Sequence, residues 1–360
     1  MSLVALAMLG IILLGIAERS KTPVMQRWFV EKMDAASRTK LAMDAIRDAR
    51  LEMGIPIDIV NDPSETGLIG FKVSPVTTSR GSHGQKLRGL DPNLAGVFVD
   101  ILKRARIGEG DRVAVGMTGA FPVMNAAMVI AVESLGATPV TIPSVGASMW
   151  GANHEDLTWL DMESILLDEG IISHRSVAAS LGGSNDNGRG LPPDGRDLVR
   201  AAIGRNGVTL IDEPTLDESI DRRMDIYAEE AEEAGEDGYD LYVNIGGGLA
   251  SIGSTQTGRL VKPGLWRNLP TKNFPRRGTL VRMAEMGVPI LHVRNPDAFV
   301  DRYGLADEPV PLPEVGTGSV FYQNRYNVPL AGVFAVLYAF VIFVVVRIDI
   351  KHYIFRKARS

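Results

Sequence analysis

The clearest hydrophobic pattern in the chain is an apolar strand, an apolar helix and a second apolar strand in direct succession. The strand spans Arg112–Met117, the helix Val123–Leu135 and the second strand Thr138–Ile142. Pro122 stands where a first helical turn tolerates proline, and Gly136 is typical of a helix end. A helix of this length between two strands predicts a right-handed βαβ unit with parallel strands.

The same alternation of helical and strand patterns continues on both sides of this unit. At least five strands alternate with helices, which predicts an α/β fold with a mainly parallel sheet and flanking helices. No internal repeat is visible. Helices are expected at Glu31–Met53, Leu94–Arg106, Asp197–Arg205, Leu216–Ala234 and Pro296–Tyr303, and a further helix is expected to end at Val281–Met286. Further strands are expected at Val208–Ile211, Asp240–Ile245 and Val288–Val293.

Both ends of the chain are strongly apolar. Residues 328–346 carry no charge, and residues 347–360 form a tail with five Lys and Arg residues and one Asp, so we expect a transmembrane helix with a cytoplasmic tail. Residues 1–17 are also uncharged, and at ~1.5 Å per residue they reach about 25 Å, slightly less than the ~30 Å hydrocarbon core. We expect an uncleaved N-terminal membrane anchor there, with a signal peptide as the alternative.

Two spans would place residues 18–327, the α/β domain, outside the cytoplasm. Arg19, Lys21 and Arg27 follow the first span and oppose this orientation, but the C-terminal charge excess is larger. With the reverse orientation the middle would be a ligand-binding domain that faces the cytoplasm.

Composition excludes some kinds of site. The 360 residues include no cysteine, so the sequence contains neither a disulfide framework nor a thiolate metal site. Five histidines are scattered without the spacing of metal ligands, and a site made of Asp186, His154 and Asp161 is the weaker alternative. We therefore expect no metal and no cofactor.

Small and polar residues follow three of the predicted strands. Thr118-Gly119 follow the first strand, Pro143-Ser144 the second, and Gly246-Gly247-Gly248 the strand at 240–245. Ligands gather at the carboxyl ends of parallel strands, and glycine lets backbone approach a ligand closely. The P-loop and dinucleotide fingerprints are missing, so a carboxylate or phosphate site is predicted, with tight turns as the alternative. Further candidate ligand-binding residues are Asn125, Asn153 and Asp186.

Nucleophilic catalysis is a second hypothesis for the same region. Thr118 and Ser148 are the candidate catalytic residues, and Ser144 is a further hydroxyl nearby in sequence. Each would need a base within hydrogen-bond reach, for which the sequence offers His83, His154, His174 and His292. No G-x-S-x-G elbow supports the hypothesis.

Charge is segregated although the net charge is only −5. Two acid-free stretches carry Lys and Arg, the first cationic segment (Thr66–Leu90) and the second cationic segment (Leu241–Ala284). Together they could form a groove for a polyanion, and the alternative is that the second segment pairs with the acidic residues of 212–240. Nucleic acid is not expected as a ligand outside the cytoplasm. The candidate cationic ligands are Lys86, Arg88, Arg276 and Arg277.

Several blocks resemble one bacterial family. They are D-P-S-E-T-G-L-I-G, G-D-R-V-A-V-G-M-T-G-A-F-P-V-M-N-A-A, G-A-S-M-W-G-A-N, S-L-G-G-S-N-D-N-G-R-G and V-N-I-G-G-G, and together they look like the poly-gamma-glutamate system protein. A serine-rich S-G-S-F-P turn would be expected in that family, where this chain has Thr118 and Ala120. The family is encoded beside the ligase and membrane subunits that make poly-gamma-glutamate.

The resemblance implies a role in making, exporting or trimming this polymer at the membrane, and it supplies no catalytic residues. The first hypothesis is a membrane-anchored accessory protein that binds the polymer or the membrane subunits of the synthase. The second is an extracytoplasmic hydrolase or transferase that acts on the gamma-glutamyl amide bond through Thr118 or Ser148.

Overall fold

The computed structural model describes residues 2–270, 273–307 and 309–357, and the chain divides into two units. One unit is Arg27–Phe321, and the other joins Met1–Gln26 to Tyr322–Ser360. Each unit is described separately below.

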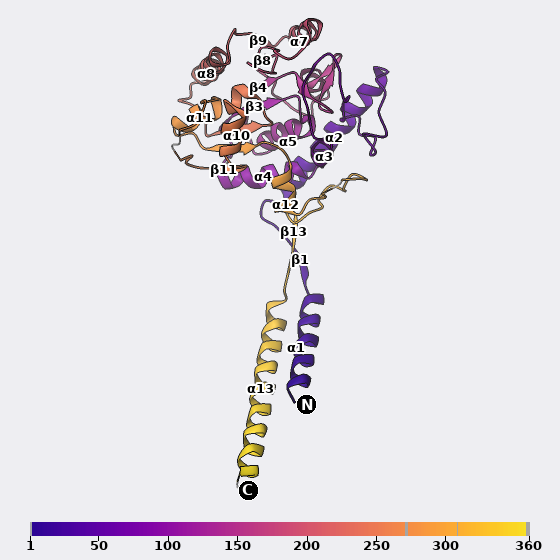
Figure 1. Cartoon of the computed structure of the whole chain (residues 1–360), viewed down its shortest axis with the longest axis vertical. Helices are drawn as coiled ribbons and strands as arrows, with labels where there is room; N and C mark the ends of the chain where they lie inside the picture. Colours follow the sequence, from indigo (N-terminus) through magenta and orange to yellow (C-terminus); the bar gives the residue numbers. More distant parts are fainter. Residues whose placement is uncertain (1, 271–272, 308, 358–360) are drawn as a thin grey trace. The chain divides into compact units, whose positions relative to one another are not determined.

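A seven-stranded sheet forms the core of the unit Arg27–Phe321 (Figure 1). All neighbouring strands are parallel except β11, which runs antiparallel to β12. This confirms the predicted α/β class with a mainly parallel sheet. The strands, in spatial order, are β11 (Gly264–Trp266), β12 (Ile290–Val293), β10 (Leu241–Ile245), β3 (Arg112–Thr118), β4 (Thr138–Ser144), β8 (Ala178–Ser180) and β9 (Thr209–Ile211).

Helices cover both faces of the sheet, because successive strand residues point to opposite faces. On β3, Val113 and Val115 join the core beneath one set of helices, whereas Ala114 joins the core on the other face. Figure 1 shows α5 and α2 on one side of the sheet and α8 and α11 on the other. The first set is α2 (Phe29–Glu52), α4 (Leu94–Ala105), α5 (Pro122–Glu133) and α6 (Trp159–Asp168), and the second α8 (Leu216–Glu233) and α11 (Thr279–Glu285).

Helix α5 explains why the predicted βαβ unit lies at the centre. Every residue from Pro122 to Val132 is buried, and all of them except Asn125 are apolar or small, because α2 and α4 cover the side of the helix that faces away from the sheet. The remaining elements of this unit are α3 (His83–Arg88), α7 (Pro193–Arg205), α9 (Leu249–Ile252), α10 (Thr255–Leu260), α12 (Asp297–Tyr303), β2 (Thr77–Ser79), β5 (Ala147–Ser148), β6 (Asn153–His154) and β7 (Leu157–Thr158).

The strand order reverses beside β3. From β3 the chain moves outward in one direction through β4, β8 and β9, and it then returns to β10 on the opposite side of β3. The connections after β3 and β10 therefore lead in opposite directions and leave a crevice beyond their carboxyl ends. In open α/β sheets this switch point is where ligands bind.

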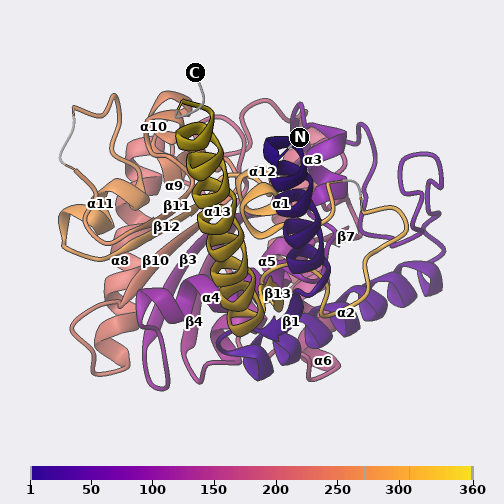
Figure 2. The ribbon, with the colours of Figure 1, turned by 90° about the horizontal axis from the view of Figure 1, so that it is seen from below.

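The second unit contains two helices and a short ribbon. Strand β1 (Thr22–Met25) pairs antiparallel with β13 (Tyr322–Arg325), and α1 (Ser2–Arg19) lies beside α13 (Val328–Lys357) (Figure 2). The Tyr338 hydroxyl on α13 donates a hydrogen bond to the Leu6 carbonyl at 3.2 Å. Thus the two ends of the chain associate with each other.

Among the described residues, one helix is long and apolar enough to cross a membrane, and it is α13 over Val328–Ile348. This agrees with the predicted span at 328–346, although the helix continues into the basic tail as far as Lys357. The predicted N-terminal span at 1–17 corresponds to helix α1. Because α1 has 18 residues and ends in Glu18 and Arg19, its uncharged part is short, and a clear second span is not established.

Candidate functional site

A cleft of about 630 Å³ opens at the switch point of the sheet. Thr118 ends β3, Ser144 ends β4, and Gly247 and Gly248 follow β10, and all four residues line this cleft. Thr118 and Ser144 are partners in the β3–β4 register, which explains why the ends of these two strands meet. The structure thus brings together the three strand ends that the sequence had marked.

Ser148 reaches the same cleft through a small parallel pairing of β2 with β5. Ser79 is the register partner of Ser148, and the Met149 amide donates to the Ser79 carbonyl at 3.0 Å. Gly81 lies against this pair. A Cβ atom there would lie 2.6 Å from the Met149 carbonyl oxygen and 3.2 Å from Ser148 Oγ, so glycine allows the approach.

Lys86 is the residue that contacts the Ser148 hydroxyl. It lies on α3, which begins after the N-cap Ser82, and only 4% of its surface is exposed. Its Nζ donates hydrogen bonds to Ser148 Oγ at 2.9 Å and to the Ala120 carbonyl. The same ammonium group lies 4.2 Å from the centroid of the Phe121 ring.

Burial lowers the pKa of Lys86 from 10.5 to about 7, because the ammonium group has lost most of its hydration. At neutral pH a large fraction of the side chain is therefore the neutral amine. A neutral amine keeps one hydrogen for the Ala120 carbonyl and offers its lone pair to the Ser148 hydroxyl. This pair has the geometry of a nucleophile beside its general base.

The histidines proposed as bases are engaged elsewhere. His83 contacts the Asn61 carbonyl at 2.6 Å, and His174 contacts Glu133 at 2.8 Å. His154 Nδ1 accepts a hydrogen bond from the Asp156 amide. His292 is fully buried against Asn244, and burial lowers its pKa to about 4. The structure therefore offers a lysine, which the sequence analysis had taken only as a ligand-binding residue, in the place of a histidine base.

A buried ion pair supports one wall of the cleft. Asp186 lines the cleft, and one of its oxygens accepts hydrogen bonds from Arg223 Nη2 at 2.9 Å and Ser219 Oγ at 2.7 Å. Its other oxygen accepts from Ser144 Oγ at 2.8 Å. Asp186 and Asn185 both adopt positive φ, at 62° and 60°. With this many partners, Asp186 holds the loop of residues 182–190 in place beside the cleft.

Several predicted ligand-binding residues instead brace the backbone around the cleft. Asn125 is fully buried and donates to the Thr118 carbonyl at 2.9 Å. Asn153 is also fully buried and bonds both to the backbone of Phe71 and to Thr77. The side chains of Asn125 and Asn153 therefore stabilise backbone turns through these hydrogen bonds. Gly119 donates its amide to the Ser144 carbonyl, and Gly246 packs directly against Thr118 Oγ1.

The predicted cationic ligands divide into two groups. Lys86 lines the cleft, whereas Arg88 pairs with Asp297 at 3.0 Å and with Asp307 at 2.7 Å. Arg276 pairs with Asp217 on α8 at 3.2 Å, and Arg277 pairs with Glu285 on α11 at 3.3 Å. None of these three arginines lines the cleft.

Two arginines that the sequence analysis did not select do line the cleft. Arg80 follows β2 and Arg294 follows β12, and neither forms an ion pair with any acid in the described part of the chain. Arg80 is exposed and Arg294 is partly buried. The signal that could have found Arg294 is its position directly after a buried strand, beside the glycines that follow β10.

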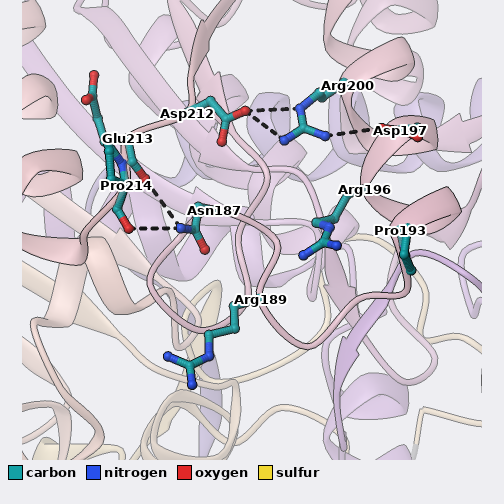
Figure 3. A pocket seen from close by; sticks show the side chains of 9 residues that line it. All are labelled: Asn187, Arg189, Pro193, Arg196, Asp197, Arg200, Asp212, Glu213 and Pro214. Carbon is teal, nitrogen blue, oxygen red and sulfur yellow. Dashed lines mark hydrogen bonds and ion pairs between the residues drawn. The ribbon is translucent and has the colours of Figure 1, made fainter.

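A second pocket, of about 540 Å³, lies between the loop of residues 182–190 and α7 (Figure 3). It is lined by three arginines and three acids, and Arg200 bridges Asp212 at 2.9 Å and Asp197 at 3.2 Å. No serine, threonine, lysine or histidine lines it. Its charges therefore largely cancel, and it lacks a nucleophile.

Both aspartates of the alternative metal site are paired with arginines. Within the described ranges there is no group of three or more His, Asp or Glu side chains placed to hold a metal ion. Of the three residues considered for such a site, Asp186 is bonded to Arg223, and Asp161 is bonded to Arg205 at 2.6 Å.

A comparison with models of known protein families found no match, and searches of curated proteins and of solved structures found no significant similarity. The resemblance to the poly-gamma-glutamate system protein thus rests on the sequence blocks alone and remains a prediction.

Proposed function

We propose that the chain is a membrane-anchored acyl hydrolase or transferase that uses Ser148 as nucleophile and Lys86 as general base. The observation that carries the proposal is the 2.9 Å contact between Lys86 Nζ and Ser148 Oγ in a cleft at the switch point. Serine–lysine pairs perform acyl transfer on several unrelated folds, so the arrangement is chemically sufficient without a histidine.

The reaction would proceed in two steps. Neutral Lys86 accepts the hydroxyl proton while Ser148 Oγ attacks the amide carbonyl carbon. The resulting ammonium then returns the proton to the leaving amine as the C–N bond breaks, and an ester to Ser148 remains. In the second step water or an amine attacks this ester with Lys86 again as base, which completes hydrolysis or transfer.

The substrate proposed here is the gamma-glutamyl amide bond of poly-gamma-glutamate, on the strength of the motif resemblance. Two features of the cleft agree with an anionic substrate. Its lining includes Arg80 and Arg294, and its one carboxylate among the described residues, Asp186, is bonded to Arg223. The α13 helix would hold the enzyme at the membrane beside the synthase subunits, with α1 as a second anchor and the cleft on the outer side.

A second candidate function is the accessory role, in which the same cleft binds the polymer and passes it on without cleavage. The unpaired arginines favour it as much as they favour the enzyme. The two candidates differ only in whether the bond is broken.

The test uses the full chain in detergent micelles with oligo-gamma-glutamate of defined length. Released amines and product sizes are measured for wild type, Ser148→Ala, Lys86→Met and Thr118→Val. We expect loss of turnover in Ser148→Ala, a reduction of ~10²–10⁴-fold in Lys86→Met, and a smaller effect in Thr118→Val, whose hydroxyl has no base beside it. Ser173→Ala and Lys262→Met are matched controls outside the cleft.

A serine-directed fluorophosphonate gives a readout that does not depend on the substrate. It should label wild type at Ser148 and leave Ser148→Ala unlabelled. Binding of the polymer without release of amines, together with no labelling, would establish the accessory role. Full turnover in Ser148→Ala would exclude the proposed nucleophile.

A further inference from the structure

The cations of the cleft have no acids to neutralise them. Asp186 is the single carboxylate among the described residues of the lining, and Arg223, Ser144 and Ser219 together occupy both of its oxygens. Arg80 and Arg294 have no ion pair in the described chain, so their guanidinium groups remain available to a ligand. Four other arginines of the two cationic segments are paired with acids, namely Arg88, Arg276, Arg277 and Arg282.

The two arginines enter the cleft from opposite sides of β3. Arg294 follows β12, which lies beyond β10 on one side of β3. Arg80 follows β2, whose partner β5 continues from β4 on the other side. A ligand that contacts both arginines must therefore present negative groups at two separated points.

The rest of the lining is polar and small. Besides Phe121 and Leu249, most of the lining consists of glycine, serine, threonine and amide side chains. Guanidinium groups bind carboxylates through paired, charge-assisted hydrogen bonds, and an apolar acyl chain would gain little from such a surface.

We propose that Arg80 and Arg294 are specificity-determining residues that bind carboxylates on two units of a polyanionic amide substrate. This inference rests on the proposed function, because it names the substrate class of the same cleft. It predicts that uncharged amides bind poorly and that each arginine contributes to binding separately.

The experiment measures binding in a chain that cannot turn over. Full-length Ser148→Ala in detergent micelles is titrated with fluorescently labelled oligo-gamma-glutamate and with its fully methyl-esterified, uncharged analogue, at several salt concentrations. The Arg80→Gln and Arg294→Gln substitutions are added separately to this background. Arg222→Gln is the matched control, because Arg222 pairs with Glu229 on α8 outside the cleft.

We expect each cleft substitution to weaken binding of the anionic probe by about tenfold at low salt and to reduce its salt dependence. The control should bind as the parent does, and the uncharged probe should bind weakly to all variants. Equal binding by the parent, Arg80→Gln and Arg294→Gln, or tight binding of the uncharged probe, would overturn the inference. Thermal unfolding of each variant checks that it is folded.

Failure of the catalytic proposal is distinguishable from failure of this one. If the parent binds the anionic probe through both arginines while wild type releases no amines, the binding role of Arg80 and Arg294 is supported and the catalytic proposal is rejected. If wild type cleaves charged and uncharged amides equally well, the catalytic proposal is supported and the specificity role of Arg80 and Arg294 is rejected.

Discussion

The two cationic segments look alike in sequence but differ in the fold. The first segment (Thr66–Leu90) delivers Arg80 and Lys86 to the cleft, where no acid pairs with Arg80 within the described chain. The second segment (Leu241–Ala284) places Arg276 and Arg282 against Asp217 and Asp221 on the acidic helix α8. To the cleft it contributes Gly247, Gly248, Leu249 and Thr255, and no cation.

The difference shows that the effect of a run of positive residues depends on whether acidic side chains lie close to it in the fold. Paired surface charges contribute little to the local potential and typically less than about 1 kcal/mol to stability. An unpaired cation in a cleft, or a buried one such as Lys86, changes both ligand affinity and proton chemistry. The following predictions test this contrast, beginning with the largest expected effect.

The first prediction concerns the pH dependence that Lys86 imposes. Because the neutral amine is the base and burial lowers its pKa to about 7, kcat/KM should rise with pH and level off above that value. Below it, the rate should fall by about tenfold for each pH unit. The measurement is the pH profile of amine release between pH 5 and pH 9.

The pH dependence of the free energy of unfolding tests the titration of Lys86 independently of activity. The pKa of Lys86 is lowered in the folded state from 10.5 to about 7, so between these values the unfolded chain binds a proton that the folded chain does not. The free energy of unfolding of wild type should therefore rise with pH in this window, relative to Lys86→Met, by up to about 1.4 kcal/mol per pH unit. A pH-independent difference between the two proteins would contradict the shifted pKa.

The second prediction concerns Gly81, which lets the first cationic segment approach Ser148. In Gly81→Ala the new methyl group would lie 2.6 Å from the Met149 carbonyl oxygen, so the backbone there must shift. Ser148 precedes Met149, and its Oγ would lie 3.2 Å from the methyl group, so we expect its contact with Lys86 to be disturbed. We expect kcat to fall by roughly ten- to a hundredfold, the cost of a small misplacement of reacting groups. In the control Gly84→Ala, on α3, a Cβ meets no atom within 4 Å, so activity should be retained. Equal activity of the two variants would show that Ser148 does not depend on this contact.

Much of the fold could be predicted because buried strands leave continuous apolar runs. The strands β3, β4, β10 and β12 were located within two residues at each end, and the convergence of Thr118 with the glycines after β10 followed from parallel strands. Strand β8 was missed, since Ala178-Ala179-Ser180 is short and carries no β-branched residue. Strand β11 was missed because its pairing depends on the tertiary fold rather than on an apolar run.

The candidate site could be predicted only in part. Ser148 and Lys86 were each selected, but their contact joins residues 62 positions apart and depends on the β2–β5 pairing, for which two- and three-residue strands give no pattern. The amine also gains its lowered pKa from burial under Phe121 and Ala120, and sequence alone does not reveal burial of a lysine. For this reason the sequence pointed to the histidines, and not to Lys86, as candidate bases.

The last prediction concerns the second cationic segment and has the smallest expected effect. Arg276→Gln and Arg277→Gln each remove one partner of a surface ion pair, with Asp217 or Glu285, and neither residue lines the cleft. We expect the double variant to bind the anionic probe within about twofold of its parent, and to lose no more than about 1 kcal/mol of stability. The measurement is the titration used for Arg80→Gln and Arg294→Gln, at the same low salt, where long-range attraction is strongest. A loss as large as that of Arg294→Gln would mean that the polymer displaces the acids of α8 and α11 from these arginines. The two cationic segments would then form one binding surface, as the charge pattern had first indicated.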